Sequence, residues 1–200
     1  MVTSVHSKIL KSIARKKKGE LIFPTDFRAI GSAAAVKTSL TRLQKSSIIE
    51  RISQGIYIIP KSDPVLGTIR PSLEDIAFAI ARRDKARIIP SGAYALQKLG
   101  ISTQVPTKLV FLTDGAPRLI KIGNRSIKFK ATTPKKLMTK GEISGLVIQA
   151  MSELGKHGIT PPIEQKIKTA LQQEKISIIK HDAELAPAWI AQKLHSFAAF

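Results

Sequence analysis

Cysteine is absent from this 200-residue sequence, and aromatic and acidic side chains are scarce. The lack of cysteine excludes disulfides, thiolate metal ligands and a cysteine nucleophile, and it suits a reducing compartment, so we expect a cytoplasmic protein. Aromatic residues make up 5% of the chain, which disfavours recognition of single-stranded nucleic acid by base stacking. No run approaches the ~18–20 uncharged apolar residues of a membrane span, and no signal peptide is recognisable, so no membrane partner is expected.

The shortage of acids leaves a strongly basic chain. Lysine and arginine number 33 against 14 acids, for a formal net charge of +19 and a pI near 10.4. Hydrophobic residues make up 43%, enough for a packed core, which excludes a disordered basic tail. A polyanion is therefore the expected partner, with nucleic acid first. A general RNA binder, or a basic surface without a specific partner, remains an alternative.

The positive charge is concentrated towards the N-terminus. Residues 1–62 hold 12 basic and 3 acidic side chains (+9), residues 63–134 hold 12 and 5 (+7), and residues 135–200 hold 9 and 6 (+3) with no arginine. Arginine suits phosphate and guanine better than lysine does, because its planar fork donates two hydrogen bonds at once. We therefore expect the polyanion surface in the first two thirds of the chain.

Residues 1–62 carry the pattern of a winged helix-turn-helix domain. The expected elements are a helix from Ser4 to Lys17, a short strand at 21–23, a short helix capped by Thr25, a helix over 33–45 capped by Ser32, and two β-branched runs at 48–52 and 56–59 that meet at Gln54-Gly55. Gly31-Ser32 forms the tight corner between the two middle helices. An unrelated small α+β domain is the alternative.

In such a domain the helix after the corner enters the major groove of DNA. If Val36, Leu40 and Leu43 face the core, the opposite side of this helix is basic and hydroxyl-rich, and the hairpin adds further polar groups. The predicted DNA-binding residues are Ser32, Lys37, Thr38, Thr41, Arg42 and Lys45, with Arg51 and Gln54 in the hairpin and Lys16, Lys17 and Lys18 after the first helix. The alternatives are a solvated helix face and, for the lysine run, a helix C-terminus that follows the helix dipole.

Residues 72–200 predict a mixed α+β domain after a polar linker at 61–71. The expected elements are a helix starting at Ser72, an extended stretch at 87–90, a helix over 91–99, strands at 108–113, 118–122 and 125–130 in a small antiparallel sheet, and helices at about 142–154, 161–174 and 187–199. The basic strand residues Arg118, Lys121, Arg125, Lys128 and Lys130 either extend the DNA surface or form an ordinary solvated sheet face. The apolar faces of the last helices form a core or a dimer interface.

Nothing in the sequence indicates an enzyme, a cofactor or a metal site. The four histidines, His6, His157, His181 and His195, lack metal-ligand spacing and are expected to be surface or capping residues. Gly31-Ser32 is not followed by the paired acids of a nucleotidyltransferase, and Ser91-Gly92 lacks the flanking glycines of a nucleophile elbow.

Several segments together resemble the AbiEi-type antitoxins and their uncharacterised relatives. They are Pro90–Leu96, Leu99–Pro106 and Phe111–Gly115, joined to Ser32–Val36, Leu40–Leu43 and Gly55–Tyr57, and the resemblance covers roughly residues 5–135. It implies a repressor of its own promoter that is also the antitoxin of a type IV toxin–antitoxin system. The implied functional partner is a nucleotidyltransferase-like toxin, without need of a stable complex.

The resemblance implies DNA contacts at Ser32, Lys37, Thr38, Thr41 and Arg42, and at Arg51 and Gln54 of the hairpin. Winged helices often bind palindromic sites as dimers, so a homodimer on DNA stays open. An RNA-binding protein and a protein-interaction module without sequence-specific DNA binding remain the alternative functions.

Overall fold

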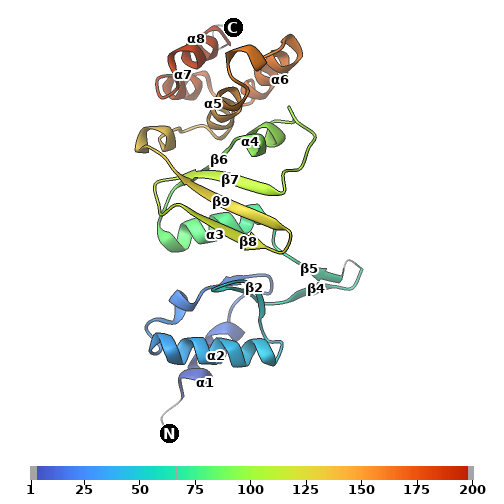
Figure 1. The fold of residues 1–200 in the computed structure, drawn as a ribbon, viewed down its shortest axis with the longest axis vertical. Coiled ribbons are helices and arrows are strands. Elements are labelled where there is room, and N and C mark those ends of the chain that lie inside the picture. The colour runs from blue at the N-terminus through green and yellow to red at the C-terminus, as the bar shows by residue number, and fades with distance from the viewer. Residues whose placement is uncertain (1–3, 66, 198–200) are drawn as a thin grey trace. The chain divides into compact units, whose positions relative to one another are not determined.

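The computed structural model describes residues 4–65 and 67–197 (Figure 1). The chain divides into two compact units, Met1–Ala79 and Ile80–Phe200. The division falls inside helix α3 (Leu73–Asp84). Helices and small sheets occur in both units, which confirms the α+β class. Among the described residues, we find no helix of the length and apolarity that a bilayer crossing requires.

The first unit packs two helices and a short 3₁₀ turn on a three-stranded antiparallel sheet. The elements of this part of the unit are α1 (Val5–Ala14), β1 (Leu21–Ile22), η1 (Pro24–Phe27), α2 (Ala33–Lys45), β2 (Glu50–Ser53) and β3 (Ile56–Ile58), with strand order β1-β3-β2. The buried core is formed by Ile9, Ile13, Ile22, Phe27, Val36, Leu40, Leu43, Ile49 and Tyr57. The predicted inward face of α2 is thereby confirmed.

Helix α2 begins and ends where the sequence predicts. The Ser32 hydroxyl accepts a 3.3 Å hydrogen bond from the Ala35 N–H and so satisfies one of the free donors of the first turn. The alanines that follow have the highest helix propensity. At the other end, the Ser46 hydroxyl donates to the Arg42 carbonyl at 3.1 Å.

The corner before α2 is tight because Gly31 is closely approached by α1. A Cβ at this position would lie 2.9 Å from Cγ1 of Val5. The position therefore excludes a side chain by lack of space.

Two local predictions for this unit are wrong. Thr25 does not cap a helix. Pro24 opens the 3₁₀ turn, and the N–H of Phe23 donates to the Asp26 carboxylate at 2.9 Å. Helix α1 ends at Ala14, before the predicted Lys17, so Lys16, Lys17 and Lys18 lie in the turn that leads to β1.

The predicted polar linker contains a second, two-stranded hairpin, β4 (Lys61–Asp63) and β5 (Gly67–Ile69). An Asx-type hydrogen bond from the Val65 N–H to the Asp63 carboxylate, at 2.9 Å, shapes its turn. Gly67 has a φ of +70°, which glycine adopts without strain. The hairpin buries little apolar surface, so its strands lack the alternating pattern by which strands are predicted.

The second unit contains a four-stranded mixed sheet. Its strands are β6 (Ile88–Ser91), β7 (Lys108–Thr113), β8 (Arg118–Ile122) and β9 (Arg125–Ala131), in the order β6-β7-β9-β8. The β8–β9 hairpin confirms the turn predicted at Gly123-Asn124, but β9 pairs with β7 in parallel, so the predicted purely antiparallel sheet is wrong. In the sheet, β9 lies between β7 and β8, and β8 forms the edge. Local turn signals in the sequence do not determine which strand of the hairpin pairs with β7.

One helix of this unit, α4 (Ala93–Lys98), lies between β6 and β7, and further helices follow β9. The further helices are η2 (Pro134–Leu137), α5 (Glu142–Leu154), η3 (Lys156–Gly158), α6 (Pro161–Leu171), α7 (Ile176–Ala183) and α8 (Ala188–Phe197). Ser91, expected in the short helix, belongs to β6, and α7 was not predicted. The core of α5–α8 includes Val147, Met151, Ile167, Ile179, Ile190 and Leu194. Trp189 and Phe197 are half-buried and pack against it.

Candidate nucleic-acid interface

The solvent-facing side of α2 gathers most of the predicted DNA-binding residues. Val36, Leu40 and Leu43 are between 0% and 2% exposed, so the helix orientation is fixed by the core. The side chains turned outward are Lys37, Thr38, Thr41, Arg42 and Lys45, with Ser32 at the helix start. This face carries three cations and two hydroxyls.

The three cations of this face are not engaged by ion pairs in the parts of the chain that the structure describes. The sequence 27–49 holds no acid, and Glu50, which begins β2, pairs with Arg70 at 2.7 Å. The nearby acid Asp26 accepts a backbone hydrogen bond in η1. The face of α2 is therefore uniformly positive, a property that favours an anionic partner.

Thr41 uses its hydroxyl hydrogen inside the helix. Its Oγ1 donates a 2.9 Å hydrogen bond to the Lys37 carbonyl, one turn earlier. What Thr41 presents outward is its methyl group and the remaining acceptor capacity of its oxygen. These suit apolar contact with a thymine methyl better than donation to a base edge.

The β2–β3 hairpin places Arg51 and Gln54 on the surface of the same unit. Both side chains are exposed, and Gly55 follows Gln54 at the turn with a φ of +69°. The register slips between Arg51 and Ser53, and Nε of Arg51 lies 3.4 Å from the Ser53 carbonyl. This weak contact leaves the guanidinium free to reorient towards a ligand.

The three lysines after α1 differ in exposure and in ion pairing. Lys16 is half-buried and forms an ion pair with Glu20, which also accepts the Lys17 N–H at 3.1 Å. The Lys16 hydrogen bond is the largest influence that holds the pKa of Glu20 below its ordinary value. Lys17 and Lys18 are exposed. Of the three predicted residues, Lys16 is thus the least available to a phosphate.

Sequence reasoning overlooked two features near α2. Arg28, at the C-terminal end of η1, is exposed. It was not predicted as a DNA-binding residue because it was expected to lie within a short helix. His6 was expected to be a surface or capping residue, but it is half-buried, and its Nδ1 lies 3.0 Å from the hydroxyl of the buried Ser39. This bond joins α1 to α2 from the side opposite the basic face.

The basic residues of the second unit's sheet separate by face. Arg118 pairs with Asp84 and lies 5.3 Å from the centre of the Phe129 ring, so its charge is used within the fold. Lys121, Arg125, Lys128 and Lys130 are exposed. Lys128 and Lys130 share one face, as predicted, because Ile127 and Phe129 between them are buried.

A buried carboxylate organises the start of α5. Asp182 is fully buried and accepts hydrogen bonds from the Lys140 and Gly141 N–H groups, both at 2.9 Å, and from the Ser144 hydroxyl at 2.6 Å. Nδ1 of His181 lies 2.8 Å away. Burial alone would raise the pKa of Asp182, but these hydrogen bonds outweigh it and lower the pKa. The cluster is a helix cap, and Ser144 is too buried to act as a nucleophile.

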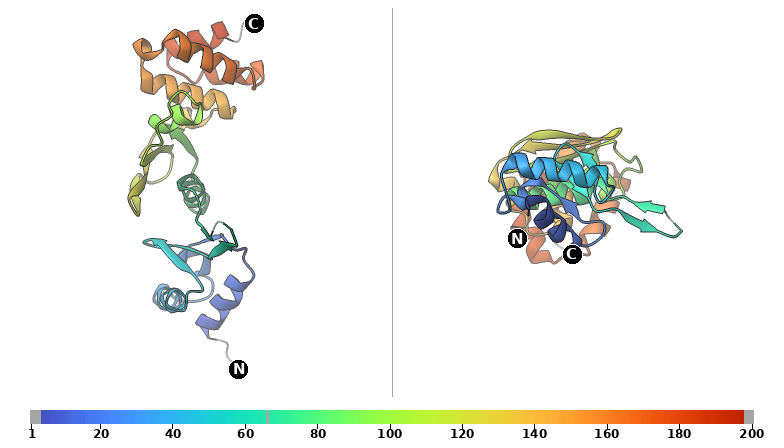
Figure 2. Two further views of the ribbon diagram at one scale, coloured as in Figure 1. Left: turned by 90° about the vertical axis from the view of Figure 1, so that its right-hand side faces the viewer. Right: turned by 90° about the horizontal axis from the view of Figure 1, so that it is seen from below.

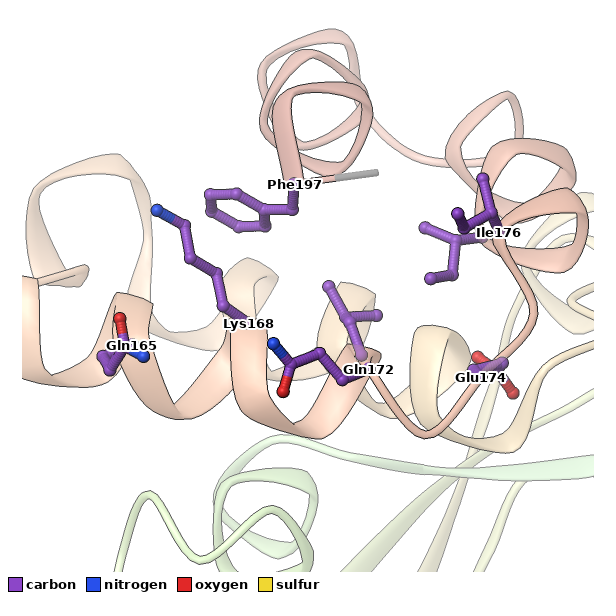
Figure 3. Close-up of a pocket in the computed structure, with 8 residues that line it drawn as sticks. Gln165, Lys168, Gln172, Glu174, Ile176 and Phe197 are labelled. Atoms are coloured by element: carbon purple, nitrogen blue, oxygen red, sulfur yellow. The ribbon is translucent and has the colours of Figure 1, made fainter. Parts of the chain in front are cut away.

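A pocket of about 460 Å³ opens between α6, α7 and the end of α8 (Figure 3). Lys168 extends beside the Phe197 ring at 5.0 Å and pairs with Glu164 at 3.1 Å. Glu174 turns its carboxylate to the N–H groups of Ile143 and Ser144. The charged groups of this pocket are therefore engaged by the fold. The described residues hold no group of three histidine or acidic side chains arranged to bind a metal.

Comparison with known proteins places the chain in a family. No curated protein matches it. Among solved structures, the crystal structure of the RV2827C protein from Mycobacterium tuberculosis matches with 13% identity and a TM-score of 0.47, over 98% of this chain and 82% of that one. A family model described as a family of unknown function, DUF6088, matches residues 8–179. Because this match extends over well more than half of the chain, the protein belongs to the DUF6088 family.

Proposed function

We propose that the first unit is a winged helix-turn-helix domain and that the protein binds duplex DNA as a repressor of its own promoter. The order α1-β1-η1-α2-β2-β3 supports this assignment, with η1 as the first helix of the pair, α2 as the recognition helix and β2–β3 as the wing. The observation that carries the proposal is the exposed face of α2, basic and rich in hydroxyls, directly opposite its buried stripe.

The residues of this face have separate tasks in the proposal. Arg42 reads a guanine through its two-pronged donor, and Thr41 contacts a thymine methyl. Lys37 and Lys45 neutralise phosphates, and the free N–H groups after Ser32 bind one more. Arg51 and Gln54 contact the minor groove or backbone beside the site, and Lys17 and Lys18 add phosphate contacts. The assignment includes no catalytic step and no cofactor.

We extend the proposal to an antitoxin of an AbiEi-like system that opposes a nucleotidyltransferase-like toxin. This part is supported by the resemblance in the segments 32–57 and 90–115. Co-expression with the product of the neighbouring gene tests it, since the full chain is expected to restore growth. If the chain fails to restore growth at equal expression, the antitoxin assignment is wrong.

The DNA-binding proposal is tested with the double variant Thr41→Ala/Arg42→Ala. We expect the ratio of affinities for the protein's own upstream duplex over random duplex to fall by about 30-fold or more, since two specific base contacts are lost and each is worth ~1–3 kcal/mol. The matched control is Thr160→Ala/Lys175→Ala, two exposed positions among the C-terminal helices, which also removes one threonine side chain and one positive charge. Equal loss in both variants, or structured RNA competing as well as the upstream duplex, would refute the proposal and favour an RNA-binding protein.

A further inference from the structure

The sheet of the second unit carries a row of lysines on one face. Lys128 and Lys130 alternate with buried residues on β9, and register places Lys121 opposite Ser126 and Lys108 beside it. Because paired residues and every second residue share a face, these four side chains point to the same side. All are exposed. We call this set, Lys108, Lys121, Lys128 and Lys130, the lysine face.

The opposite face of the sheet is occupied by the fold. Phe111, Ile127 and Phe129 are at most 3% exposed there. Residues 80–84, the part of α3 that belongs to this unit, reach this side, where Asp84 pairs with Arg118, and Figure 2 shows this end of the green helix beside the sheet. The sheet thus has one face that is covered along β7 and β9. On the other face, ammonium groups are exposed beside the exposed Leu119, whereas Leu112, the register partner of Lys130, is buried.

No acid lies on β7, β8 or β9, whose sequences contain no aspartate or glutamate. The first acid after β7, Asp114, is bound by Arg87, whose Nε donates to it at 2.8 Å. The hydrogen bonds from Arg87 are the largest influences that lower the pKa of this carboxyl. The charges of Lys108, Lys128 and Lys130 are therefore not balanced by an acid on the strands that carry them.

Protection of a sheet edge does not account for the arrangement. Lysines on an edge strand prevent pairing with a second sheet, and Lys121 on the edge strand β8 fits that purpose. Lys128 and Lys130, however, lie on β9, which is paired on both sides by β7 and β8. Lys128 and Lys130 follow each other on the same face of this strand, and the repulsion between their like charges would be relieved by a bound anion.

The chemistry of the face selects its ligand. The aromatic residues of β7 and β9 point to the covered side, so no ring is offered for base stacking, which single-stranded nucleic acid requires. Lysines contact phosphates as point charges and read no sequence. We propose that the lysine face is a second nucleic-acid surface, which binds the phosphate backbone of duplex DNA without sequence preference.

The choice of DNA over RNA rests on the proposed function of the first unit. When α2 holds a duplex, the second unit of the same chain meets DNA at a high effective concentration. A weak, sequence-independent contact then adds to affinity without adding to specificity. A second DNA-binding surface would also explain why residues 63–134 carry a net charge of +7, which DNA binding by α2 does not explain.

The test compares two triple variants of the full chain. Lys108→Gln/Lys128→Gln/Lys130→Gln removes three charges of the lysine face, and Lys156→Gln/Lys175→Gln/Lys180→Gln removes three exposed charges of the helical region. Affinity for a random 30-base-pair duplex is measured over a salt series. Each lost phosphate contact reduces the steepness of the plot of log K against log salt by ~0.9. We therefore expect the slope of the lysine-face variant to be shallower than that of the parent by about 2–3, and the slope of the control variant to be unchanged. Far-UV circular dichroism verifies that both variants fold.

Equal salt slopes in the two triple variants would overturn the inference. It would also be overturned if the lysine-face variant lost binding to duplex RNA while its binding to duplex DNA was unchanged. Preference for the upstream sequence, measured in parallel with Arg42→Ala, separates this result from the proposed function. A lysine-face variant that keeps its preference while its slope falls supports the inference. Arg42→Ala could leave the preference for the upstream duplex intact while the lysine-face variant still shows a reduced salt dependence on DNA. In that case the proposed sequence recognition by α2 is wrong, and the inference about the lysine face is still supported.

Discussion

The hydroxyl of Thr41 donates a 2.9 Å hydrogen bond to the carbonyl of Lys37 and is thereby turned back onto its own helix. A hydroxyl used in this way is not free to donate to a base. Its methyl group is the part of the side chain that remains for contact, and this relationship decides which substitutions of Thr41 the proposed interface tolerates.

Thr41→Val keeps the methyl and removes the internal hydrogen bond. We expect affinity for the upstream duplex to stay within about threefold of the parent, whereas Thr41→Ser, which keeps the hydroxyl and loses the methyl, weakens binding by about 5-fold or more, at ~1 kcal/mol for a lost apolar base contact. Fluorescence anisotropy with a labelled duplex measures both. If valine is the more damaging residue, the hydroxyl reads the base and the methyl assignment is wrong.

Ser32 allows the stability of α2 to be separated from its contact with DNA. Ser32→Ala removes the cap and should lower the free energy of unfolding by about 1 kcal/mol, whereas Ser32→Asp also caps and should keep it. The aspartate nevertheless places a negative charge where a phosphate is proposed to lie, so duplex affinity should fall at least about tenfold.

Urea unfolding followed by circular dichroism, together with anisotropy, tests the two effects of Ser32. The proposed placement of the phosphate would be contradicted by Ser32→Asp binding DNA as well as the parent does.

Gly31 and Val5 form a steric pair between the corner and α1. Gly31→Ala places a methyl 2.9 Å from Val5 Cγ1, so we expect a loss of about 1–3 kcal/mol in stability, the usual cost of overpacking. Val5→Ala in the same chain should restore a large part of this loss, because it vacates the contested space. Urea unfolding of the two single variants and the double variant measures the coupling. Additive effects would show that space at Val5 is not the reason for glycine.

Asp182 makes the stability of the helical region depend on pH. Because its pKa is lowered on folding, the carboxylate stabilises the fold fully above the unfolded pKa of ~3.9 and loses this contribution as pH falls through the folded pKa. Asp182→Asn should cost about 2–3 kcal/mol at pH 7, since buried donors lose a charged acceptor. The difference between parent and variant should shrink below about pH 4.

Fluorescence of Trp189, the chain's single tryptophan, reports unfolding of this region because the residue packs against its core. The control is Glu184→Gln, whose side chain is 75% exposed and pairs with His195, and it should change stability little. A difference between parent and Asp182→Asn that is the same at pH 3 and pH 7 would show that ionisation of Asp182 does not stabilise the fold.

The elements that were predicted most accurately from the sequence have both a clear hydrophobic pattern and recognisable turn residues at their ends. Helix α5 has a continuous apolar stripe, and β7 to β9 alternate or run apolar between clear turns, so their bounds are correct to within one residue. Helix α7 is short, and Lys175, the residue before its first turn, makes no side-chain cap hydrogen bond, which explains why no start signal was seen. The parallel pairing of β7 and β9 depends on which strand edge is free after the hairpin forms, and no local pattern encodes that choice.

The candidate site was predictable where one face of a helix decides exposure. Burial of Leu40 fixed the outward direction of Thr41 and Arg42, and both are exposed as expected. The engagement of Lys16 by Glu20 and of Arg118 by Asp84 was not foreseen, because ion pairs depend on side-chain geometry. Their neutralisation removes two of the cations that the charge count alone would assign to nucleic acid.

The most direct test of the central claim is competition binding of the full chain to its own upstream duplex, against random duplex and structured RNA, at salt concentrations between 50 and 200 mM. The account predicts that the upstream duplex wins over both competitors. It also predicts that six to ten phosphate contacts make affinity fall by ~10³–10⁵ over this range. A flat salt dependence, or displacement by RNA as efficient as by the upstream duplex, would contradict it.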